Sequence, residues 1–401
     1  MNLGNLYNDK ELLFQLDQKQ KEIGEFLLNC NPDDVANVGI MDGLAGVGLA
    51  LSLYYRNTSD ERFLDKLEQT IKVINKKINL GKDIVSSYAQ GIAGYAWLII
   101  YLKENNLIEI VINDYLFEID DFIYQQLTLM IEAKQYDPLH GAVGIGFYFL
   151  KRGNTEAIEK IIDGLYNDRK NFSGYTTWIR RNQKSNKDDI DFGLAHGIPG
   201  ILFFLFKCYL KHIASQKCSE MIRENITFMN DFMNFSGIPS FFPYTFEYEL
   251  LKQFDRKKNW SRLAWCYGDL SALSVFFYLS SYFPIQMNIT SMLEQVSKRR
   301  NEVATDVNIT GICHGTSGIA HIFFRLFQKT GSHCFEDACH YWLKRTLLIG
   351  NEPTGVNGFL FHENSNIQPL DLLTGISGVG SVFLSFLNPD LIGWDESILL
   401  S

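Results

Sequence analysis

The sequence has no excess of positive charge. Of its 401 residues, 37 are Lys or Arg and 46 are Asp or Glu, which leaves a net charge of −9. No stretch is basic enough to follow a phosphate backbone through counterion release, so we expect no nucleic-acid partner. General disorder is also excluded, because 46% of the residues are hydrophobic and 21% are charged, enough apolar material for a large core.

The N-terminus and the cysteines lack the marks of a secreted protein. The first ten residues contain no basic head followed by an apolar run, so no signal peptide is expected. The cysteines are odd in number, irregularly spaced and without a C-x-x-C pair, which favours reduced thiols or metal ligands over a disulfide framework. They are Cys30, Cys208, Cys218, Cys266, Cys313, Cys334 and Cys339. Both observations predict a cytoplasmic protein.

Two uncharged runs are long enough to raise the question of a membrane span, at residues 84–102 and 270–293. They contain Ser, Gln, Gly and Pro284, and each coincides with the apolar half of a repeat described below. We interpret both as buried core helices and expect no transmembrane segment.

A glycine turn followed by a small residue or second glycine, and then by an apolar run, recurs seven times. The first glycines of the copies are Gly43, Gly91, Gly141, Gly197, Gly268, Gly315 and Gly375. They stand 48, 50, 56, 71, 47 and 60 residues apart, which is room for two helices of about 15 residues plus loops. The fifth copy has Ser271 in place of the second glycine, which puts its local packing in question.

The two helices expected in each repeat differ in character. Residues 47–55, after the first glycine pair, are apolar nearly all round, whereas residues 61–78 are amphipathic. This predicts an inner and an outer layer of helices. The first and last copies are as apolar as the middle ones, although an open solenoid needs polar caps. We therefore predict an all-α fold, a closed α/α toroid of seven helical hairpins forming one domain over 1–401, with small insertions at about 171–191 and 234–260.

In this toroid the residues just before the first glycines would all face one pole. Cys266 and Cys313-His314 stand on adjacent repeats, with the cysteines 47 residues apart. Two thiolates and one imidazole suit a zinc site whose fourth position is open. Spacing alone also allows buried, inert cysteines. A rival cluster spans 333–340, but Cys334 and Cys339 cannot join His333 and His340 on one helix face without distortion.

Four motifs around these residues point to a known family. They are Asp137-Pro138-Leu139-His140-Gly141, Ala195-His196-Gly197-Ile198-Pro199-Gly200, Ser261-Arg262-Leu263-Ala264-Trp265-Cys266-Tyr267-Gly268 and Ile312-Cys313-His314-Gly315. With them, essentially the whole chain resembles the lanthionine synthetase C-like family, specifically the stand-alone lantibiotic cyclases. The resemblance implies one Zn²⁺ per chain, with Cys266, Cys313 and His314 as its ligands.

The same resemblance implies roles for other pole-facing residues. His196 and Asp137 become candidates for the catalytic acid and base, without a choice between them, and Arg262 and Tyr267 would line the site. Each has a plainer interpretation: Asp137 as a helix N-cap, Arg262 in an ion pair, Tyr267 in the core. Asp371 precedes its glycine by the same spacing as Asp137, and only the motif match favours Asp137. The resemblance assigns no role to His140, which is expected to be structural or to lie at the rim.

The implied reaction is the addition of peptide cysteine thiols to dehydroalanine or dehydrobutyrine, which forms lanthionine and methyllanthionine rings. Expected partners are a dehydrated lantibiotic precursor peptide, a dehydratase and an ABC exporter, with the chain in the cytoplasm or held by partners at the inner face of the membrane. Residues 171–191 would touch the precursor or form a solvated connection. Three alternatives stay open: conjugation of glutathione to an activated double bond, a prenyltransferase-like activity, and a non-catalytic scaffold.

Overall fold

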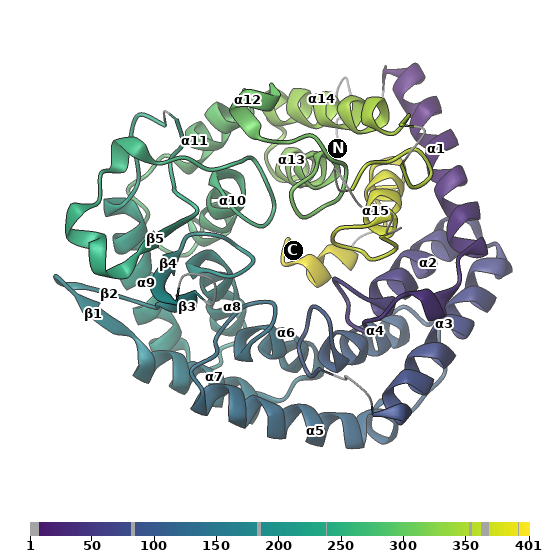
Figure 1. The fold of residues 1–401 in the computed structure, drawn as a ribbon, viewed down its shortest axis with the longest axis horizontal. Coiled ribbons are helices and arrows are strands. Elements are labelled where there is room, and N and C mark those ends of the chain that lie inside the picture. The colour runs from purple at the N-terminus through teal and green to yellow at the C-terminus, as the bar shows by residue number, and fades with distance from the viewer. Residues whose placement is uncertain are drawn as a thin grey trace. The chain divides into compact units, whose positions relative to one another are not determined.

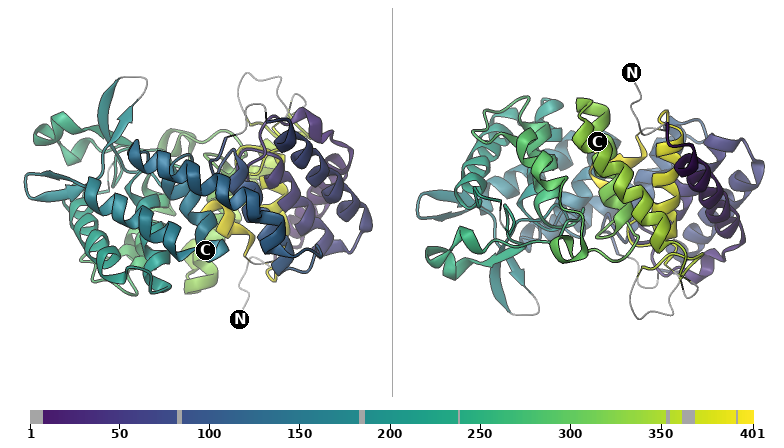
Figure 2. Two further views of the ribbon diagram at one scale, coloured as in Figure 1. Left: turned by 90° about the horizontal axis from the view of Figure 1, so that it is seen from below. Right: turned by 90° about the horizontal axis from the view of Figure 1, so that it is seen from above.

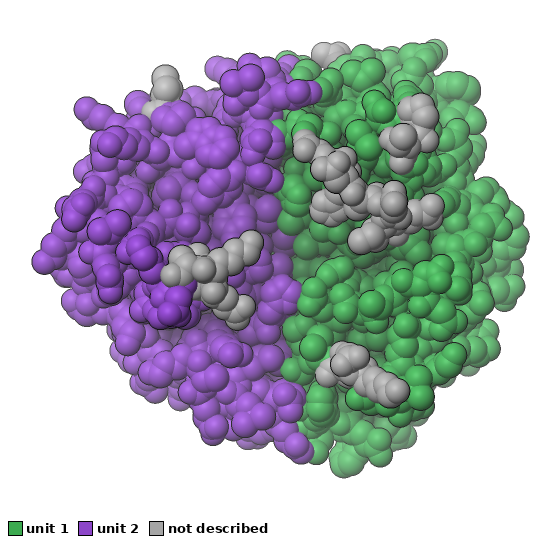
Figure 3. All heavy atoms as spheres, in the orientation of Figure 1, with its two compact units in different colours: residues 1–123, 307–401 green, residues 124–306 purple. Residues whose placement is uncertain are grey.

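The computed structural model describes residues 8–81, 85–182, 186–237, 239–352, 355–361, 369–391 and 393–401. Contacts between residues divide the chain into two compact units (Figure 3). Unit 1 comprises Met1–Ile123 and Val307–Ser401, and unit 2 comprises Tyr124–Asp306. A single domain over the whole chain therefore stays a prediction.

Unit 1 is built from helices that follow glycine loops and from longer helices packed against them (Figure 1). The helices after glycine loops are α2 (Leu44–Thr58), α4 (Ile92–Glu104), α13 (Thr316–Thr330) and α15 (Ile376–Leu387). The others are α1 (Lys10–Asn29), α3 (Glu61–Leu80) and α14 (His333–Ile349), with the short 3-10 helices η2 (Pro32–Asp34) and η5 (Trp394–Ile398). Helix α5 (Ile112–Glu132) begins in unit 1 and ends in unit 2.

Unit 2 repeats this plan and adds strands. Its helices after glycine loops are α6 (Ala142–Arg152), α8 (Ile198–Leu210) and α10 (Asp269–Leu279), and each packs against the helix that follows it. Those following helices are α7 (Thr155–Asp168), α9 (Ser215–Asp231) and α11 (Ile289–Val296), with α12 (Glu302–Thr305) after α11. The strands are β1 (Lys170–Phe172), β2 (Tyr175–Thr177), β3 (Arg180–Asn182), β4 (Lys187–Asp191) and β5 (Thr245–Glu247), with η3 (Tyr248–Gln253) and η4 (Arg256–Lys258).

The burial of these helices follows their sequence patterns. Helix α2 is buried on every side from Leu44 to Tyr54, whereas α3 buries only one stripe, made of Phe63, Leu67, Thr70 and Ile74. In unit 1, α13, α15, α2 and α4 pack in succession, and α14 and α3 pack against α13 and α2 (Figure 1). The predicted inner and outer helices are therefore present within each unit.

Each predicted first glycine is the N-cap of an inner helix. Because glycine has no side chain, it cannot accept a capping hydrogen bond from the first N–H groups of the helix. The loop backbone does this instead, because the N–H after the glycine donates to a carbonyl seven residues earlier. Such bonds run from Leu44 to Asn37 (3.0 Å), Ile92 to Val85 (3.0 Å), Ala142 to Gln135 (2.8 Å), Thr316 to Ile309 (2.9 Å) and Ile376 to Pro369 (2.9 Å). The second glycine permits this tight loop, since a Cβ on Gly318 would lie 1.9 Å from the Ile312 oxygen.

The fifth copy solves the same problem differently. Gly268 has a φ of +99°, a left-handed conformation that favours glycine, and a Cβ there would lie 2.1 Å from the Arg262 oxygen. Ser271, in place of the second glycine, is buried and donates its hydroxyl proton to the Gly268 carbonyl at 3.1 Å. The missing glycine therefore changes the local packing without removing the loop.

Neighbouring glycine loops are joined by backbone hydrogen bonds at one repeat position, two residues before the glycine. In unit 1 the N–H of Cys313 donates to Leu373 at 2.9 Å, and that of Leu373 donates to Met41 at 2.8 Å. In unit 2 the N–H of Ala195 donates to Cys266 at 3.1 Å. Cys266 and Cys313 thus occupy equivalent positions in their repeats, although they are far apart in the sequence.

The two predicted insertions contain short strands that the sequence did not reveal. β1 and β2 form an antiparallel hairpin, and β3, β4 and β5 form a three-stranded antiparallel sheet. These strands belong to the teal part of the ribbon in Figure 2. Asp191 on β4 pairs with Thr245 on β5, so the insertions at 171–191 and 234–260 join in one sheet.

Within the described residues, no helix combines the length and apolar character needed to cross a membrane. The run at 84–102 covers most of α4, and Ile84 itself lies outside the described residues. The run at 270–293 is divided between α10 and α11.

Candidate active site and metal centre

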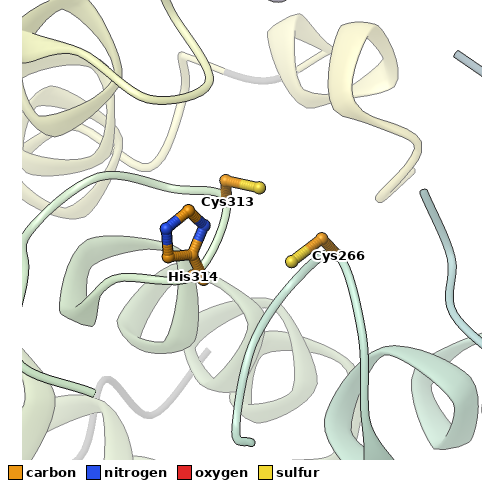
Figure 4. A group of neighbouring side chains, drawn as sticks. All are labelled: Cys266, Cys313 and His314. Atoms are coloured by element: carbon orange, nitrogen blue, oxygen red, sulfur yellow. The ribbon is translucent and has the colours of Figure 1, made fainter. Parts of the chain in front are cut away.

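Cys266, Cys313 and His314 end the loops before α10 and α13. Their candidate ligand atoms all lie within 4.8 Å of one another (Figure 4). Cys266 is buried, while Cys313 and His314 are half-buried. Tetrahedral zinc, with bonds of about 2.0–2.3 Å, holds its ligand atoms about 3.3–3.8 Å apart, so small side-chain adjustments would bring this donor set onto one ion. No second group of this kind occurs in the part of the chain that the structure describes.

A buried ion pair fixes the loop that carries Cys266. Asp269, the first residue of α10, lies 2.9 Å from Arg299 and accepts a hydrogen bond from the Phe242 N–H at 2.9 Å. Arg299 also donates to the Ser261 carbonyl at 2.7 Å. Burial raises the pKa of Asp269 to about 6 in spite of these partners. The start of the Cys266 loop and the start of α10 are therefore held by the same pair.

Asp137 and His196 form the closest pair of titratable groups among the predicted residues. Oδ2 of Asp137 lies 2.8 Å from Nδ1 of His196, and about a fifth of each side chain is exposed. Oδ1 of Asp137 accepts hydrogen bonds from the N–H groups of Leu139 and His140 at 2.8 and 2.9 Å. Asp137 thus caps its own loop and orients the imidazole at the same time. With its proton on Nδ1, His196 presents Nε2 to its surroundings.

Their mutual contact sets the direction of both pKa values. Burial raises the pKa of the Asp137 carboxyl, but the hydrogen bond and charge of His196 outweigh it, so the pKa lies below its ordinary value. Burial lowers the pKa of His196, but Asp137 outweighs it, so this pKa lies above the ordinary imidazole value. His196 is therefore a stronger base than an isolated histidine.

Tyr267 leads to a residue that the motif analysis did not single out. Its ring centroid lies 6.1 Å from that of His196, and its hydroxyl donates to Oδ2 of Asp191 at 3.1 Å. Burial raises the pKa of Tyr267. Asp191 is buried and accepts the N–H of Gly193 at 2.8 Å, and burial raises its pKa to about 6. A lone carboxylate between apolar residues, Ile190-Asp191-Phe192, was the signal that could have revealed it.

Arg262 has the ion pair that the plainer interpretation anticipated. Its Nη2 lies 2.9 Å from Asp306, and its Nε donates to the Tyr244 hydroxyl at 2.9 Å. Burial lowers its pKa, but Tyr244 and the charges of Asp306 and Cys266 outweigh this effect, so the pKa lies above its ordinary value. Arg262 is therefore charged, fixed and near the Cys266 thiol.

The remaining candidates make other contacts. Asp371 accepts hydrogen bonds from the N–H and hydroxyl of Thr374 at 2.6 and 3.1 Å, within its own loop. His140 is exposed, and its ring is stacked on His196 with centroids 5.8 Å apart. In the rival cluster, His333 pairs with Glu336 at 2.7 Å and His340 with Asp9 at 2.8 Å. These two histidines therefore face carboxylates.

Comparisons with known proteins address the family and the fold of the chain. The family model described as lanthionine synthetase C-like protein matches residues 34–399. The nisin biosynthesis protein NisC of Lactococcus lactis subsp. lactis is 23% identical over 360 residues, which cover 79% of this chain and 78% of that protein. A solved structure of nisin cyclase superposes with a TM-score of 0.72 at 19% identity, covering 98% of this chain and 97% of that one.

The structural likeness shows the fold. The predicted fold class, an all-α chain of the α/α toroid type, is confirmed by it. The family match spans nearly the whole chain, including the glycine loops and all the candidate site residues. The chain belongs to the lanthionine synthetase C-like family.

Proposed function

We propose that the chain is a zinc-dependent cyclase that forms lanthionine and methyllanthionine rings in a dehydrated precursor peptide. Family membership and the likeness to nisin cyclase support an enzyme that closes thioether rings. The observation that carries zinc dependence is the convergence of Cys266, Cys313 and His314, whose ligand atoms lie within 4.8 Å of one another. Two thiols and one imidazole are a donor set suited to catalytic zinc.

The proposed reaction adds a cysteine S–H across the C=C bond of dehydroalanine or dehydrobutyrine. A sulfur–Cβ bond forms, the π electrons move to give an enolate, the thiol proton leaves, and a proton returns to Cα. No atom is gained or lost. Since a free thiol has a pKa of about 8.5, only a small part of it is thiolate at neutral pH, and the enolate needs both charge stabilisation and a proton.

Cys266, Cys313 and His314 would hold the zinc through two thiolates and one imidazole. Zinc bound by three protein ligands supplies an open coordination position that favours the thiolate form of an incoming cysteine. The burial of Cys266 keeps water from part of this donor set. The thiolate charges of the two cysteines offset that of the metal, which leaves an incoming sulfur electron-rich.

His196 would move the proton. Its raised pKa, which Asp137 causes, lets it accept the thiol proton and return one to the α-carbon. Asp137 would orient the imidazole through the 2.8 Å contact to Nδ1. Arg262 and Tyr267 would line the site, with the Arg262 guanidinium offsetting negative charge that develops during addition.

The substrate implies partners. A dehydratase must supply dehydroalanine and dehydrobutyrine, and an ABC exporter would remove the product. Both partners would work with the chain in the cytoplasm, or hold it at the inner face of the membrane.

An alkylation assay tests the proposed function. Dehydrated precursor is incubated with the chain and then treated with a thiol-alkylating reagent. Its mass is measured by mass spectrometry before and after alkylation. We expect an unchanged precursor mass before alkylation and fewer alkylated cysteines after it. Persistence of every alkylatable thiol would rule out the cyclase, and a mass gain when glutathione is present would indicate conjugation instead.

Cys313→Ala identifies the role of the metal centre, with Cys334→Ala as the matched control outside it. Cys313→Ala should abolish ring formation, and Cys334→Ala should leave it unchanged. If Cys313→Ala lowers the melting temperature but the number of rings made in cells stays the same, the chain acts as a scaffold and the proposal is wrong.

A further inference from the structure

Arg180 is the first residue of β3, and its guanidinium reaches the group around Tyr267. Its Nη1 lies 3.1 Å from Oδ2 of Asp191. The same carboxylate oxygen accepts the hydroxyl proton of Tyr267 at 3.1 Å. The guanidinium and the phenol therefore meet on one oxygen atom, and the Tyr267 ring lies beside that of His196. Arg180 is thus a second cation near the proposed acid and base, in addition to Arg262.

Asp191 is fixed well enough to hold this cation. Only 2% of its side chain is exposed, and its other oxygen accepts the Gly193 N–H at 2.8 Å. Gly193 allows Tyr267 to pack closely, because a Cβ there would lie 2.5 Å from the Tyr267 ring. The backbone of Asp191 is held in turn by pairing with Thr245 on β5. Asp191 is therefore a buried carboxylate with a fixed position, and it offers a charge-assisted hydrogen bond to the Arg180 guanidinium.

The neighbouring arginine shows that this orientation is specific. Arg181 follows Arg180 on β3, so its side chain leaves the opposite face of the strand. It is 57% exposed and donates to Asp188 and Asn186 at 3.1 and 2.8 Å. Arg180 is 45% exposed even with one nitrogen on Asp191, so donors of its guanidinium remain accessible to a ligand.

We propose that Arg180, held in place by Asp191, binds the carbonyl oxygen of the dehydrated residue and stabilises the enolate that forms there. Arg180 is then a substrate-binding residue and Asp191 a positioning residue. This inference rests on the proposed function. It also gives the three-stranded sheet a part in the site, because β3 carries the cation, β4 carries its carboxylate, and β5 holds β4.

The two arginines differ in what surrounds them. Arg262 lies near the Cys266 thiol, and both Tyr244 and Asp306 engage its guanidinium. Arg180 interacts electrostatically with Asp137, Asp191 and His196, and its charge acts to lower the pKa of His196. Arg262 would therefore offset negative charge that develops near Cys266, and Arg180 negative charge that develops near His196.

This placement fits the order of charges in the reaction. When the sulfur–Cβ bond forms, the π electrons of the C=C bond move toward the carbonyl, and the oxygen becomes negative. A fork of N–H donors already aimed at that oxygen stabilises it more than it stabilises the neutral carbonyl. The proton from His196 then reaches Cα, the carbonyl is restored, and the guanidinium is unchanged.

Steady-state ring closure by Arg180→Ala tests the proposal, with Arg181→Ala as the matched control. We expect kcat to fall about 100-fold in Arg180→Ala with a small change in KM, the pattern of a lost transition-state contact. Arg180→Lys keeps the positive charge but not the forked set of N–H donors, so its kcat should lie between that of Arg180→Ala and that of the wild type. Roughly 50 mM guanidinium, far below denaturing concentrations, should restore part of the activity of Arg180→Ala. The same addition should leave the activity of the wild type unchanged.

Asp191→Asn tests the positioning role. Its single amide oxygen can still accept the Gly193 N–H, and its amide nitrogen can donate to the Tyr267 hydroxyl, but the negative charge that holds Arg180 is lost. We expect kcat to fall, and we expect Arg180→Ala to add little when both changes are combined, because both act through one contact. Circular dichroism melting confirms that each variant is folded.

The outcomes separate the two proposals. If wild-type protein closes no rings, the proposed function is wrong. If wild-type protein closes rings and Arg180→Ala does so at the same rate, only the inference about Arg180 is wrong. A loss of activity in Arg180→Ala with no rescue by guanidinium, together with an additive double variant, would also overturn it.

Discussion

The orientation of His196 depends on one hydrogen bond. Asp137 lies 2.8 Å from Nδ1, so the proton is held on that nitrogen and Nε2 is available for chemistry. The same carboxylate raises the pKa of the imidazole above its ordinary value. In the proposed mechanism, Asp137 would therefore control both which nitrogen of His196 reacts and the pH at which the imidazole is neutral.

Asp137→Asn should shift the pH dependence of ring closure. The amide can still accept the N–H groups of Leu139 and His140, so the loop stays capped, but the negative charge beside His196 is lost. The pKa of His196 then falls, with Arg180 acting in the same direction and Asp191 opposing it. We expect the acidic limb of kcat/KM against pH to move down by about one pH unit, with a lower maximum.

A pH–rate profile of wild type and variant, supported by NMR titration of His196, measures this shift. Glu68→Gln, a change in an exposed helical ion pair with Lys72, serves as the control and should leave the profile unchanged. An acidic limb at the same pH in Asp137→Asn would show that His196 is not the group that titrates.

The sequence predicted the residues that share a repeat position but not those that reach the site from elsewhere. Cys266 and Cys313 could be found because each stands two residues before a glycine. Arg180 could not, because its approach depends on the pairing of β3 with β4, and the one signal for Asp191 was a lone carboxylate between apolar residues. Asp137 and Asp371 have the same spacing from a glycine, and their different contacts, with His196 and with Thr374, could not be predicted from that spacing.

Among the elements, α10 shows how a helix start can be fixed without a side-chain cap. Asp269 is 1% exposed and Arg299 is 14% exposed, so their ion pair is largely removed from water. Their other bonds reach Phe242 and Ser261. The pair therefore ties the loop before α10 to segments on both sides of it.

Asp269→Asn should destabilise the protein strongly. The substitution leaves the Arg299 charge buried without its partner, and breaking such a pair typically costs about 3–5 kcal/mol of unfolding free energy. Denaturant unfolding followed by circular dichroism measures the change. Lys72→Gln, in a pair whose side chains are 72% and 65% exposed, should cost under about 1 kcal/mol. A similar small cost in Asp269→Asn would contradict this account of the loop.

Helices and strands differed in how well the sequence predicted them. The inner helices could be located because each follows a glycine and is apolar on every side, as in α2. The strands were missed because β1, β2, β3 and β5 are three residues long, too short for an alternating pattern to appear. Their pairing, as between Asp191 and Thr245, joins segments that sequence analysis treated separately.

At the scale of the whole molecule, the repeated glycine copies predicted the fold class. The first and last copies are as apolar as the others, which argued against an open array, and the likeness to nisin cyclase over 98% of the chain confirms the toroid class. The division into two compact units had no counterpart in the sequence pattern, since the copies continue through both boundaries at 123 and 307.

X-ray absorption at the zinc edge, on protein purified without added metal and quantified for zinc, tests the central claim most directly. The account predicts one zinc per chain with two sulfur ligands at about 2.3 Å and nitrogen or oxygen ligands at about 2.0–2.2 Å. Cys313→Ala should lose a sulfur ligand or the metal, and Cys334→Ala should match the wild type. A chain that closes rings without bound zinc, or that holds zinc without sulfur ligands, would contradict the account.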